Sequence, residues 1–229
     1  MKILAVGAHP DDVELGCGAT LALYKKMKHE VHILVLTRGE ASGDPEVREI
    51  ECKKSAEILC ADRVHFGNMQ DTKISDGVET IMKIENVIKK VKPDIVFAHS
   101  SKDGHQDHRN AGLASLSAAR DSKKVLLFES PAALRDFCPQ VFVDVTSTFE
   151  DKLNALRAYG SQSSKVYFRG DPVVHRSVRT RPGENRKFPY VSNAVEGLAR
   201  YRGFQAGVTL AEAFEVGKFI LDIQDSSKH

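Results

Sequence analysis

A short segment near the start of the sequence, Gly7–Gly18, brings together side chains that suit a divalent metal ion. It reads GAHPDDVELGCG and follows an apolar run, so it falls where a buried strand turns into a helix. A dinucleotide-binding protein carries G-x-G-x-x-G at this place, but here the glycine spacing differs and the turn holds His9, Asp11 and Asp12. Two carboxylates repel a phosphate group, whereas an imidazole beside two carboxylates suits a divalent cation. The segment therefore indicates either a metal site or a helix start whose acids interact with the helix dipole.

A second segment, His99–Asn110, adds three more side chains of the same kind. It reads HSSKDGHQDHRN, follows another apolar run, and contains His105, Asp107 and His108. Taken alone, these residues are compatible with ordinary loop histidines. In an open α/β sheet, however, ligands bind beyond the carboxyl ends of the strands, where the strand order reverses. In an order such as 3-2-1-4-5 that reversal lies between strands one and four, so we expect both segments at one crevice.

The rest of the chain alternates between short apolar runs and amphipathic stretches, as α/β proteins do. The predicted strands are Lys2–Ala8, Val31–Thr37, Val64–Phe66, Asp94–His99, Val125–Phe128 and, as a sixth, Val141–Val145. The predicted helices are Leu15–Lys28, Glu46–Cys60, Val78–Val91, Gln106–Ala119, Asn193–Tyr201 and Leu210–Leu221. This alternation predicts an α/β, Rossmann-like three-layer sandwich, in which a mainly parallel sheet has helices on both faces.

The length of 229 residues fits one domain. We expect a single domain over 1–229, with a Rossmann-like core in about 1–150, C-terminal helices and a loop in 151–222 that complete the site, and a disordered tail at 223–229. The basic stretch Arg176–Lys187 is interpreted as a solvated loop, or else as a border of the pocket that recognises a phosphate or nucleotide on the substrate.

The composition is that of an ordinary soluble globular protein. The formal net charge is only +2, so nothing in the overall charge argues for nucleic-acid or membrane binding, and we expect no nucleic-acid partner. No apolar stretch approaches the roughly 20 residues of a membrane span, and the apolar start of the chain is too short for a signal peptide, so we expect a cytoplasmic protein. The four cysteines form no C-x-x-C pair. Cys17, between two glycines, is interpreted as a small buried residue rather than a nucleophile.

The sequence resembles the LmbE-like or PIG-L family of zinc-dependent N-acetylglucosaminyl deacetylases. The two hallmarks of this family, A-H-P-D-D and H-x-D-H, occur without substitution at Ala8–Asp12 and His105–His108. The resemblance runs from Met1 to about Gly217, and its further segments are LTRGEA from Leu36, Arg48 with Glu51, RGFQAG from Arg202 and AEAF from Ala211. The combination is specific to the family but not to one substrate. Because family members are often oligomers, it also implies a homo-oligomer.

The resemblance implies a zinc ion held by His9, Asp12 and His108. Three protein ligands leave one position open for water, which is typical of a catalytic rather than a structural site. The resemblance also implies that Asp11 is the general base, which takes a proton as water attacks the acetyl carbon. Iron, manganese or cobalt can replace zinc in such a set of ligands, depending on availability.

Four further residues receive roles from the same resemblance. His105 is expected to stabilise the tetrahedral oxyanion and to help protonate the departing amine. Asp107 is expected to orient an imidazole, or else to be a surface acid that caps the following helix. Arg48 is expected to reach the acyl or sugar part of the substrate, or else to be a solvated arginine on its helix. Asp71 is expected to bind sugar hydroxyls, although the family's usual G-F-x-D reads differently in GNMQD.

The predicted function is removal of an N-acetyl group from an N-acetylglucosamine-type amino sugar or conjugate, a small-molecule substrate. The same machinery can serve another N-acyl compound, such as an antibiotic, a lipid or a thiol-precursor intermediate, because the motif residues hardly touch the remainder of the substrate. A non-catalytic nucleotide- or sugar-binding module is the remaining alternative. It is disfavoured because a binding module needs no base next to the metal ligands.

Overall fold

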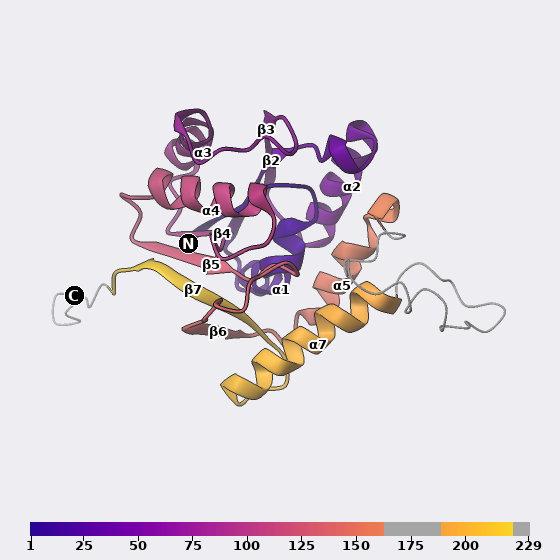
Figure 1. Cartoon of the computed structure of the whole chain (residues 1–229). Coiled ribbons are helices and arrows are strands. Elements are labelled where there is room, and N and C mark those ends of the chain that lie inside the picture. The colour runs from indigo at the N-terminus through magenta and orange to yellow at the C-terminus, as the bar shows by residue number, and fades with distance from the viewer. Residues whose placement is uncertain (163–188, 222–229) are drawn as a thin grey trace.

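The computed structural model describes residues 1–162 and 189–221 of the chain. Within these ranges the chain forms a seven-stranded sheet in the order β3-β2-β1-β4-β5-β7-β6, with helices packed against it (Figure 1). The strands are β1 (Lys2–Gly7), β2 (Glu30–Thr37), β3 (Arg63–Met69), β4 (Ile95–His99), β5 (Lys124–Phe128), β6 (Val141–Asp144) and β7 (Ala211–Phe219). The helices are α1 (Asp12–Lys26), α2 (Pro45–Ile58), α3 (Val78–Val91), α4 (Gln106–Ala118), α5 (Phe149–Arg157) and α7 (Pro189–Ala206), with the short 3-10 helices η1 (Glu40–Ser42) and η2 (Gly160–Gln162).

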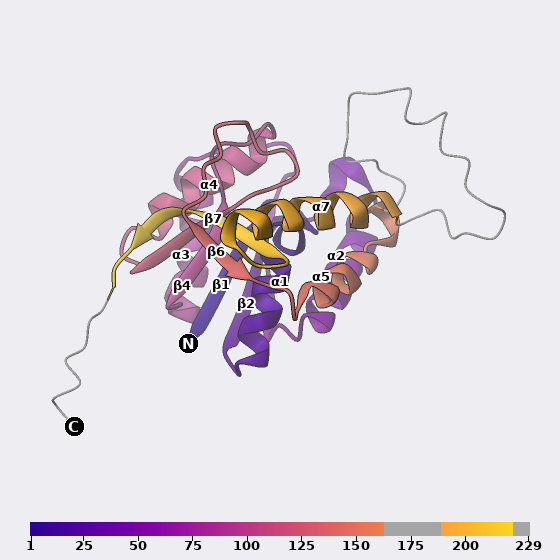
Figure 2. The same ribbon diagram turned by 90° about the horizontal axis from the view of Figure 1, so that it is seen from below.

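The sheet is parallel from β3 to β5, and the two strands beyond it are antiparallel to their neighbours. Because side chains alternate between the faces, Ile3 and Ala5 of β1 pack on the side of α1 and α2, whereas Leu4 and Val6 pack on the side of α3 and α4. Both faces of β1 are therefore apolar, which explains its unbroken apolar sequence. A further apolar cluster joins α1, α5 and α7 on the first side (Figure 2).

The predicted fold class is confirmed, and each of the six predicted strands overlaps an observed one. The strand order reverses between β1 and β4, as expected for a doubly wound sheet. The predicted helix Asn193–Tyr201 lies within α7. The basic stretch Arg176–Lys187 and the tail 223–229 lie outside the described residues. In the described ranges, no helix combines the length and apolar character needed to cross a membrane.

The prediction of a helix at Leu210–Leu221 was wrong, because these residues contribute the strand β7. This strand lies between β5 and β6, and Phe214 pairs with Phe128 on one side and Val141 on the other. A short apolar stretch is compatible with the periodicity of a helix or of a strand. Here the backbone hydrogen bonds to β5 and β6 stabilise the strand. Helix α5 was not predicted at all.

Gly16 of α1 packs directly against the buried ring of Phe128 at the end of β5. A Cβ atom added at Gly16 would lie 2.1 Å from Cδ2 of Phe128. We therefore expect Gly16→Ala to lower the free energy of unfolding by about 1–3 kcal/mol, as measured by urea denaturation. Gly197→Ala in α7 is the matched control, because nothing lies within 4 Å of its added Cβ and alanine favours a helix. Equal effects of the two substitutions would contradict the tight packing at Gly16.

Candidate metal centre and active site

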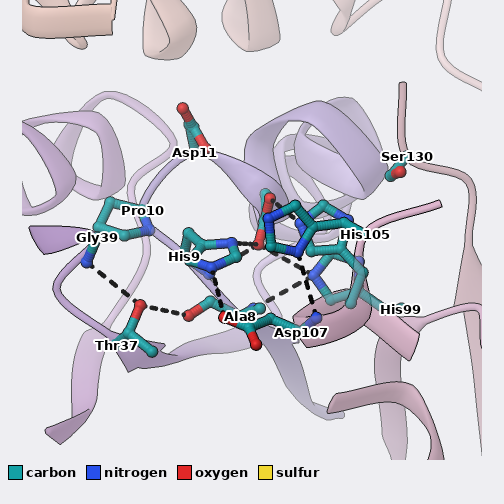
Figure 3. A network of polar contacts seen from close by, with 12 residues as sticks. Ala8, His9, Pro10, Asp11, Thr37, Gly39, His99, His105, Asp107 and Ser130 are labelled. Atoms are coloured by element: carbon teal, nitrogen blue, oxygen red, sulfur yellow. Dashed lines mark hydrogen bonds and ion pairs between the residues drawn. The ribbon is translucent and has the colours of Figure 1, made fainter. Parts of the chain in front are cut away.

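The two segments that carry the histidines and aspartates lie side by side at the carboxyl ends of β1 and β4 (Figure 3). These strands are parallel neighbours, with Ala5 opposite Phe97. The last residue of β4, His99, reaches the turn after β1, where the Ala8 N–H donates a hydrogen bond to His99 Nε2 at 3.2 Å. The crevice expected from the strand order therefore contains both segments.

The predicted metal ligands His9, Asp12 and His108 meet at the carboxylate of Asp12. His9 Nδ1 lies 3.3 Å from Asp12 Oδ2, and His108 Nε2 lies 3.3 Å from Asp12 Oδ1. Two ligands of a tetrahedral zinc ion, each about 2.0–2.1 Å from the metal, are about 3.3 Å apart, so these spacings fit such an ion. All three residues are buried. Each histidine therefore lies at a ligand-to-ligand spacing from one oxygen of Asp12, and this donor chemistry suits a divalent ion such as zinc.

The imidazoles around Asp12 form one continuous cluster. Donor atoms of His9, His105 and His108 lie within 4.8 Å of one another, and so do those of Asp12, His99 and His108. The rings of His99 and His108 stack with their centroids 4.2 Å apart. His108 belongs to both of these sets, and a third set of donors within the same distance consists of His9, Asp71 and Asp107.

The charges around Asp12 keep its carboxyl group ionised, which is the form that binds a cation. Burial raises the pKa of Asp12, but the imidazoles of His108 and His99 outweigh burial and hold the pKa well below its usual value. Burial lowers the pKa of His108, but the carboxylates of Asp12 and Asp103 outweigh burial and raise it to about 9. Asp12 is therefore ionised at neutral pH, and His108 carries a proton that a metal ion must displace.

Asp103 makes hydrogen bonds to two of the histidines, His108 and His105. Its Oδ2 lies 3.2 Å from His108 Nδ1, and its Oδ1 accepts a hydrogen bond from the His105 N–H at 2.7 Å. The Ser130 hydroxyl donates to Asp103 Oδ2. Because Nδ1 of His108 faces this carboxylate, its Nε2 is the nitrogen that faces Asp12.

Asp107 and Asp71 both lie against His9, with carboxylate oxygens 3.2 and 3.0 Å from its Nε2. Asp107 is fully buried and so is not a surface acid, and the Thr72 N–H donates to its Oδ2 at 2.7 Å. Asp71 also accepts a hydrogen bond from the Ala41 N–H at 3.0 Å. With Nε2 engaged by these carboxylates, Nδ1 of His9 is the nitrogen that faces Asp12.

Asp11 stands apart from the imidazole cluster, and in Figure 3 its carboxyl group points away from His9. Its φ of 96° lies in the left-handed region that few residues other than glycine adopt. Arg48 of α2, almost fully buried, stabilises this turn, because its NH2 donates to Pro10 O at 2.7 Å and lies 3.6 Å from Asp11 Oδ2. Its NH1 donates to Gly39 O at 3.0 Å. Arg48, expected at the substrate, therefore contacts the turn that carries Asp11.

Arg48→Met is expected to lower the free energy of unfolding by about 1–3 kcal/mol, because the carbonyls of Pro10 and Gly39 lose a buried donor. Urea denaturation measures this change. Arg157→Met is the control, because that side chain is 44% exposed and its loss should cost at most about 0.5 kcal/mol. An unchanged unfolding free energy together with a raised KM would instead assign Arg48 to substrate binding.

His105 lies partly buried at the wall of the cavity, beside His9 and His108, with ring centroids 5.0 and 4.6 Å away. Burial and these two imidazoles lower its pKa, so the ring is neutral at neutral pH. The Asp107 N–H donates to His105 Nδ1 at 3.2 Å, which places the ring proton on Nε2. His105 therefore offers an Nε2–H donor of the kind that stabilises a developing oxyanion.

Three residues without a predicted role also belong to this network, namely His99, Asp103 and Ser130. His99 is fully buried, and its Nε2 lies 3.1 Å from Asp12 Oδ2. Both His99 and Asp103 lie in the second segment, so the grouping of polar residues there was a usable signal. Ser130 follows β5, the next strand of the sheet, and its place just beyond a strand end was the available signal.

The network opens into a cavity of about 650 Å³. Its walls include Asp11, Asp12, Arg48, His105 and Pro131. Small-molecule sites typically enclose about 300–1,000 Å³, so this cavity has the size for a ligand of that class.

Residues 4–119 match the family described as PIG-L: GlcNAc-PI de-N-acetylase. The chain is 36% identical over 168 residues to the uncharacterized deacetylase YaiS of Escherichia coli (strain K12), an alignment that covers 69% of this chain and 90% of the relative. It is 30% identical over 186 residues to the diacetylchitobiose deacetylase of Thermococcus kodakarensis, with 70% of each chain covered. It is also 24% identical over 208 residues to the 4-oxalmesaconate hydratase of Pseudomonas putida, with 78% of this chain and 80% of the relative covered.

Among solved structures, the conserved protein TT1542 from Thermus thermophilus superposes with a TM-score of 0.78 at 27% identity, and 96% of each chain is covered. The range that matches the family contains both histidine- and aspartate-bearing segments. The resemblance seen in the sequence is thus confirmed, and the chain belongs to the PIG-L family.

Proposed function

We propose that this protein is a zinc-dependent hydrolase that removes an N-acetyl group from an N-acetylglucosamine-type amino sugar or conjugate. The observation that carries the proposal is the arrangement around Asp12, where His9 and His108 each lie 3.3 Å from one of its oxygens at the wall of the cavity. In this proposal His9, Asp12 and His108 hold the ion. Asp11, which stands beside the ligands without joining their cluster, is the general base. The named deacetylases among the relatives support amide hydrolysis.

A zinc ion at this site would supply a Lewis acid for the amide carbonyl and would make a water molecule acidic enough to lose its proton near neutral pH. The proton transfers belong to side chains of the chain itself. Asp11 accepts a proton from the attacking water, and Arg48 holds the turn that presents it. His105 donates a hydrogen bond from its Nε2–H to the carbonyl oxygen as negative charge develops there, and the departing amine takes up the proton that Asp11 accepted from water.

The buried carboxylates act on the imidazoles in this mechanism. Asp103 orients His108, and Asp107 orients His9, through the contacts described above. Asp71 lines the cavity, and its oxygens have lone pairs beyond those used by His9 and Ala41, so it can also accept a hydrogen bond from a sugar hydroxyl.

An acetate-release screen of the zinc-loaded protein tests the proposal, using N-acetylated sugars, sugar phosphates and glycosides. We expect acetate and a free amine from compounds based on N-acetylglucosamine. We also expect turnover to disappear with a strong chelator and to return with added zinc. Release of acetate only from another N-acyl compound, such as an antibiotic or a lipid, would keep the chemistry and overturn the sugar as substrate.

A hydratase is the second candidate function, because a relative of that name aligns with 78% of this chain. Hydration and amide hydrolysis both require an activated water molecule, but a hydratase adds it across a carbon–carbon double bond and releases no acetate. Loss of ultraviolet absorbance from an unsaturated carboxylic acid measures hydration directly. Such turnover, with no acetate from any N-acetylated sugar, would replace the first proposal by the second.

A further inference from the structure

Helix α1, which begins with Asp12, is broken about one turn after its start. Cys17 has φ −146° and ψ 16°, which are not helical values. The first segment, residues 12–16, carries Asp12, and the second continues from Gly18 to Lys26. At such a break, carbonyl groups of the first segment and N–H groups of the second lose their helical partners and need others.

Two charged side chains from distant elements bind these backbone groups. Glu212 of β7 accepts hydrogen bonds from the Ala19 N–H at 3.1 Å and the Thr20 N–H at 2.7 Å. Lys152 of α5 donates to Leu15 O at 2.7 Å and to Glu212 Oε1 at 2.7 Å. In an unbroken helix the Ala19 N–H would donate to Leu15 O. The ion pair therefore connects the two groups that this helical bond would join, and Figure 2 shows α5 lying beside α1.

The burial and the charges of the pair agree with this bridging position. Lys152 is 3% exposed and Glu212 is 4% exposed. The negative charge faces the N-terminus of the second segment and the positive charge faces the C-terminus of the first, which are the favourable signs for a helix dipole. A buried ion pair contributes little to stability compared with packed apolar residues, so stability alone does not account for one at this break.

The first segment is also the part of α1 that reaches the metal centre. Asp12 accepts a hydrogen bond from the His9 N–H at 2.7 Å and faces His108. Leu15, whose carbonyl binds Lys152, lines the same cavity. Because the break separates this single turn from the remainder of α1, its orientation depends on contacts from outside the helix.

We propose that Lys152 and Glu212 are positioning residues. Their ion pair sets the orientation of the first turn of α1 and thereby orients the carboxylate of Asp12 toward the metal ion. This inference rests on the proposed metal site but not on the identity of the substrate. Among the described residues, the hydrogen bonds of this pair go to α1 and between the two side chains, so their effect reaches the site through the first turn of α1, which carries Asp12 and Leu15.

The decisive variant is Lys152→Met combined with Glu212→Leu. It removes both charges together, so no buried charge is left uncompensated and the protein is expected to fold. We expect its dissociation constant for zinc, measured by competition with a chelator, to rise by roughly 10–100-fold, as for other residues that orient metal ligands. The visible spectrum of the cobalt-loaded variant should shift as well, because the spectrum reports the geometry of the ligands.

Thr148→Val is the matched control. The buried Thr148 hydroxyl donates to Ala19 O at 2.8 Å, so this substitution weakens the second segment of α1 and leaves the first untouched. We expect a lower Tm with unchanged zinc affinity and an unchanged cobalt spectrum. A folded double variant that binds both metals like the starting protein would overturn the inference, as would a loss of affinity in both variants that simply follows Tm.

If the double variant does not fold, Glu212→Gln is measured in the same assays, since its amide oxygen still accepts one of the two N–H groups. Unchanged affinity and spectrum in Glu212→Gln would equally overturn the inference. The proposed function can be contradicted independently of this inference. If the unsubstituted protein binds zinc but releases no acetate, the deacetylase proposal is contradicted and the inference about Lys152 and Glu212 still stands. A starting protein that binds no zinc contradicts the metal site itself.

Discussion

Asp11→Asn is expected to lower kcat by about 10²–10⁴-fold while the protein still binds zinc, because an amide cannot accept the proton of the attacking water. Asparagine matches aspartate in shape and tolerates the left-handed φ of 96° at this position, so the turn should persist. Acetate release under saturating substrate measures the loss, and the zinc content of the same preparation shows that the ligands remain in place.

Asp121→Asn serves as the control for this substitution, since Asp121 is exposed and precedes β5, whereas the ligands follow the carboxyl ends of the parallel strands at the opposite edge of the sheet. It should leave both turnover and zinc content unchanged. Full turnover in Asp11→Asn would assign the base to another residue. Loss of zinc from this variant would instead mean that Asp11 also helps to bind the ion, in addition to accepting a proton.

Arg48 gives an independent check on Asp11. If Arg48 acts by holding the turn of Pro10 and Asp11, then Arg48→Met should cost little further activity once Asp11 is already asparagine. Residues that act as one unit are not additive, whereas separate contributions to the barrier add. Additive losses would indicate that Arg48 acts on the substrate independently of Asp11.

The sequence alone was sufficient to predict those features of this protein that depend on local sequence pattern and on sheet topology. Residues of β1 pack on both faces of the sheet, which agrees with the continuous apolar run Lys2–Ala8 from which a buried strand was predicted. The rule that parallel strands place their following loops at one edge brought His9 and His108 together without any structural information. The family resemblance supplied roles for these residues, which the pattern alone could not.

What the sequence did not reveal depends on contacts between residues far apart in the chain. The strand β7 was taken for a helix because its pairing with β5 and β6 is not visible in its own residues. Glu212 binds the N–H of Ala19, 193 positions away, at a break in α1 between Gly16 and Gly18. The two glycines mark the break, but nothing in the sequence shows which side chain binds there. The contact of Ser130 with Asp103 likewise depends on the loop after β5, which the sequence near Asp103 does not show.

The largest loss of metal affinity is expected from Asp12→Asn. The pKa of Asp12 is held well below its usual value, so its carboxylate supplies a full negative charge to the site, and the substituted amide supplies none. Asp103→Asn changes no proposed ligand, only the carboxylate that contacts His108 and the His105 N–H, and should weaken zinc binding by about 10–100-fold. We expect Asp12→Asn to exceed that loss and to abolish turnover. Chelator competition and acetate release measure the two quantities.

The ranking of these two variants also tests which donors hold the ion. A ligand set of His9, Asp12 and His108 requires Asp12→Asn to be the more severe change. The opposite ranking would favour the neighbouring set of His9, His105 and His108, whose donor atoms lie within 4.8 Å of one another. Asp103 supports both His105 and His108, so its loss would then disturb two ligands at once. In that case His105 could no longer donate to the oxyanion, and the mechanism would need another donor.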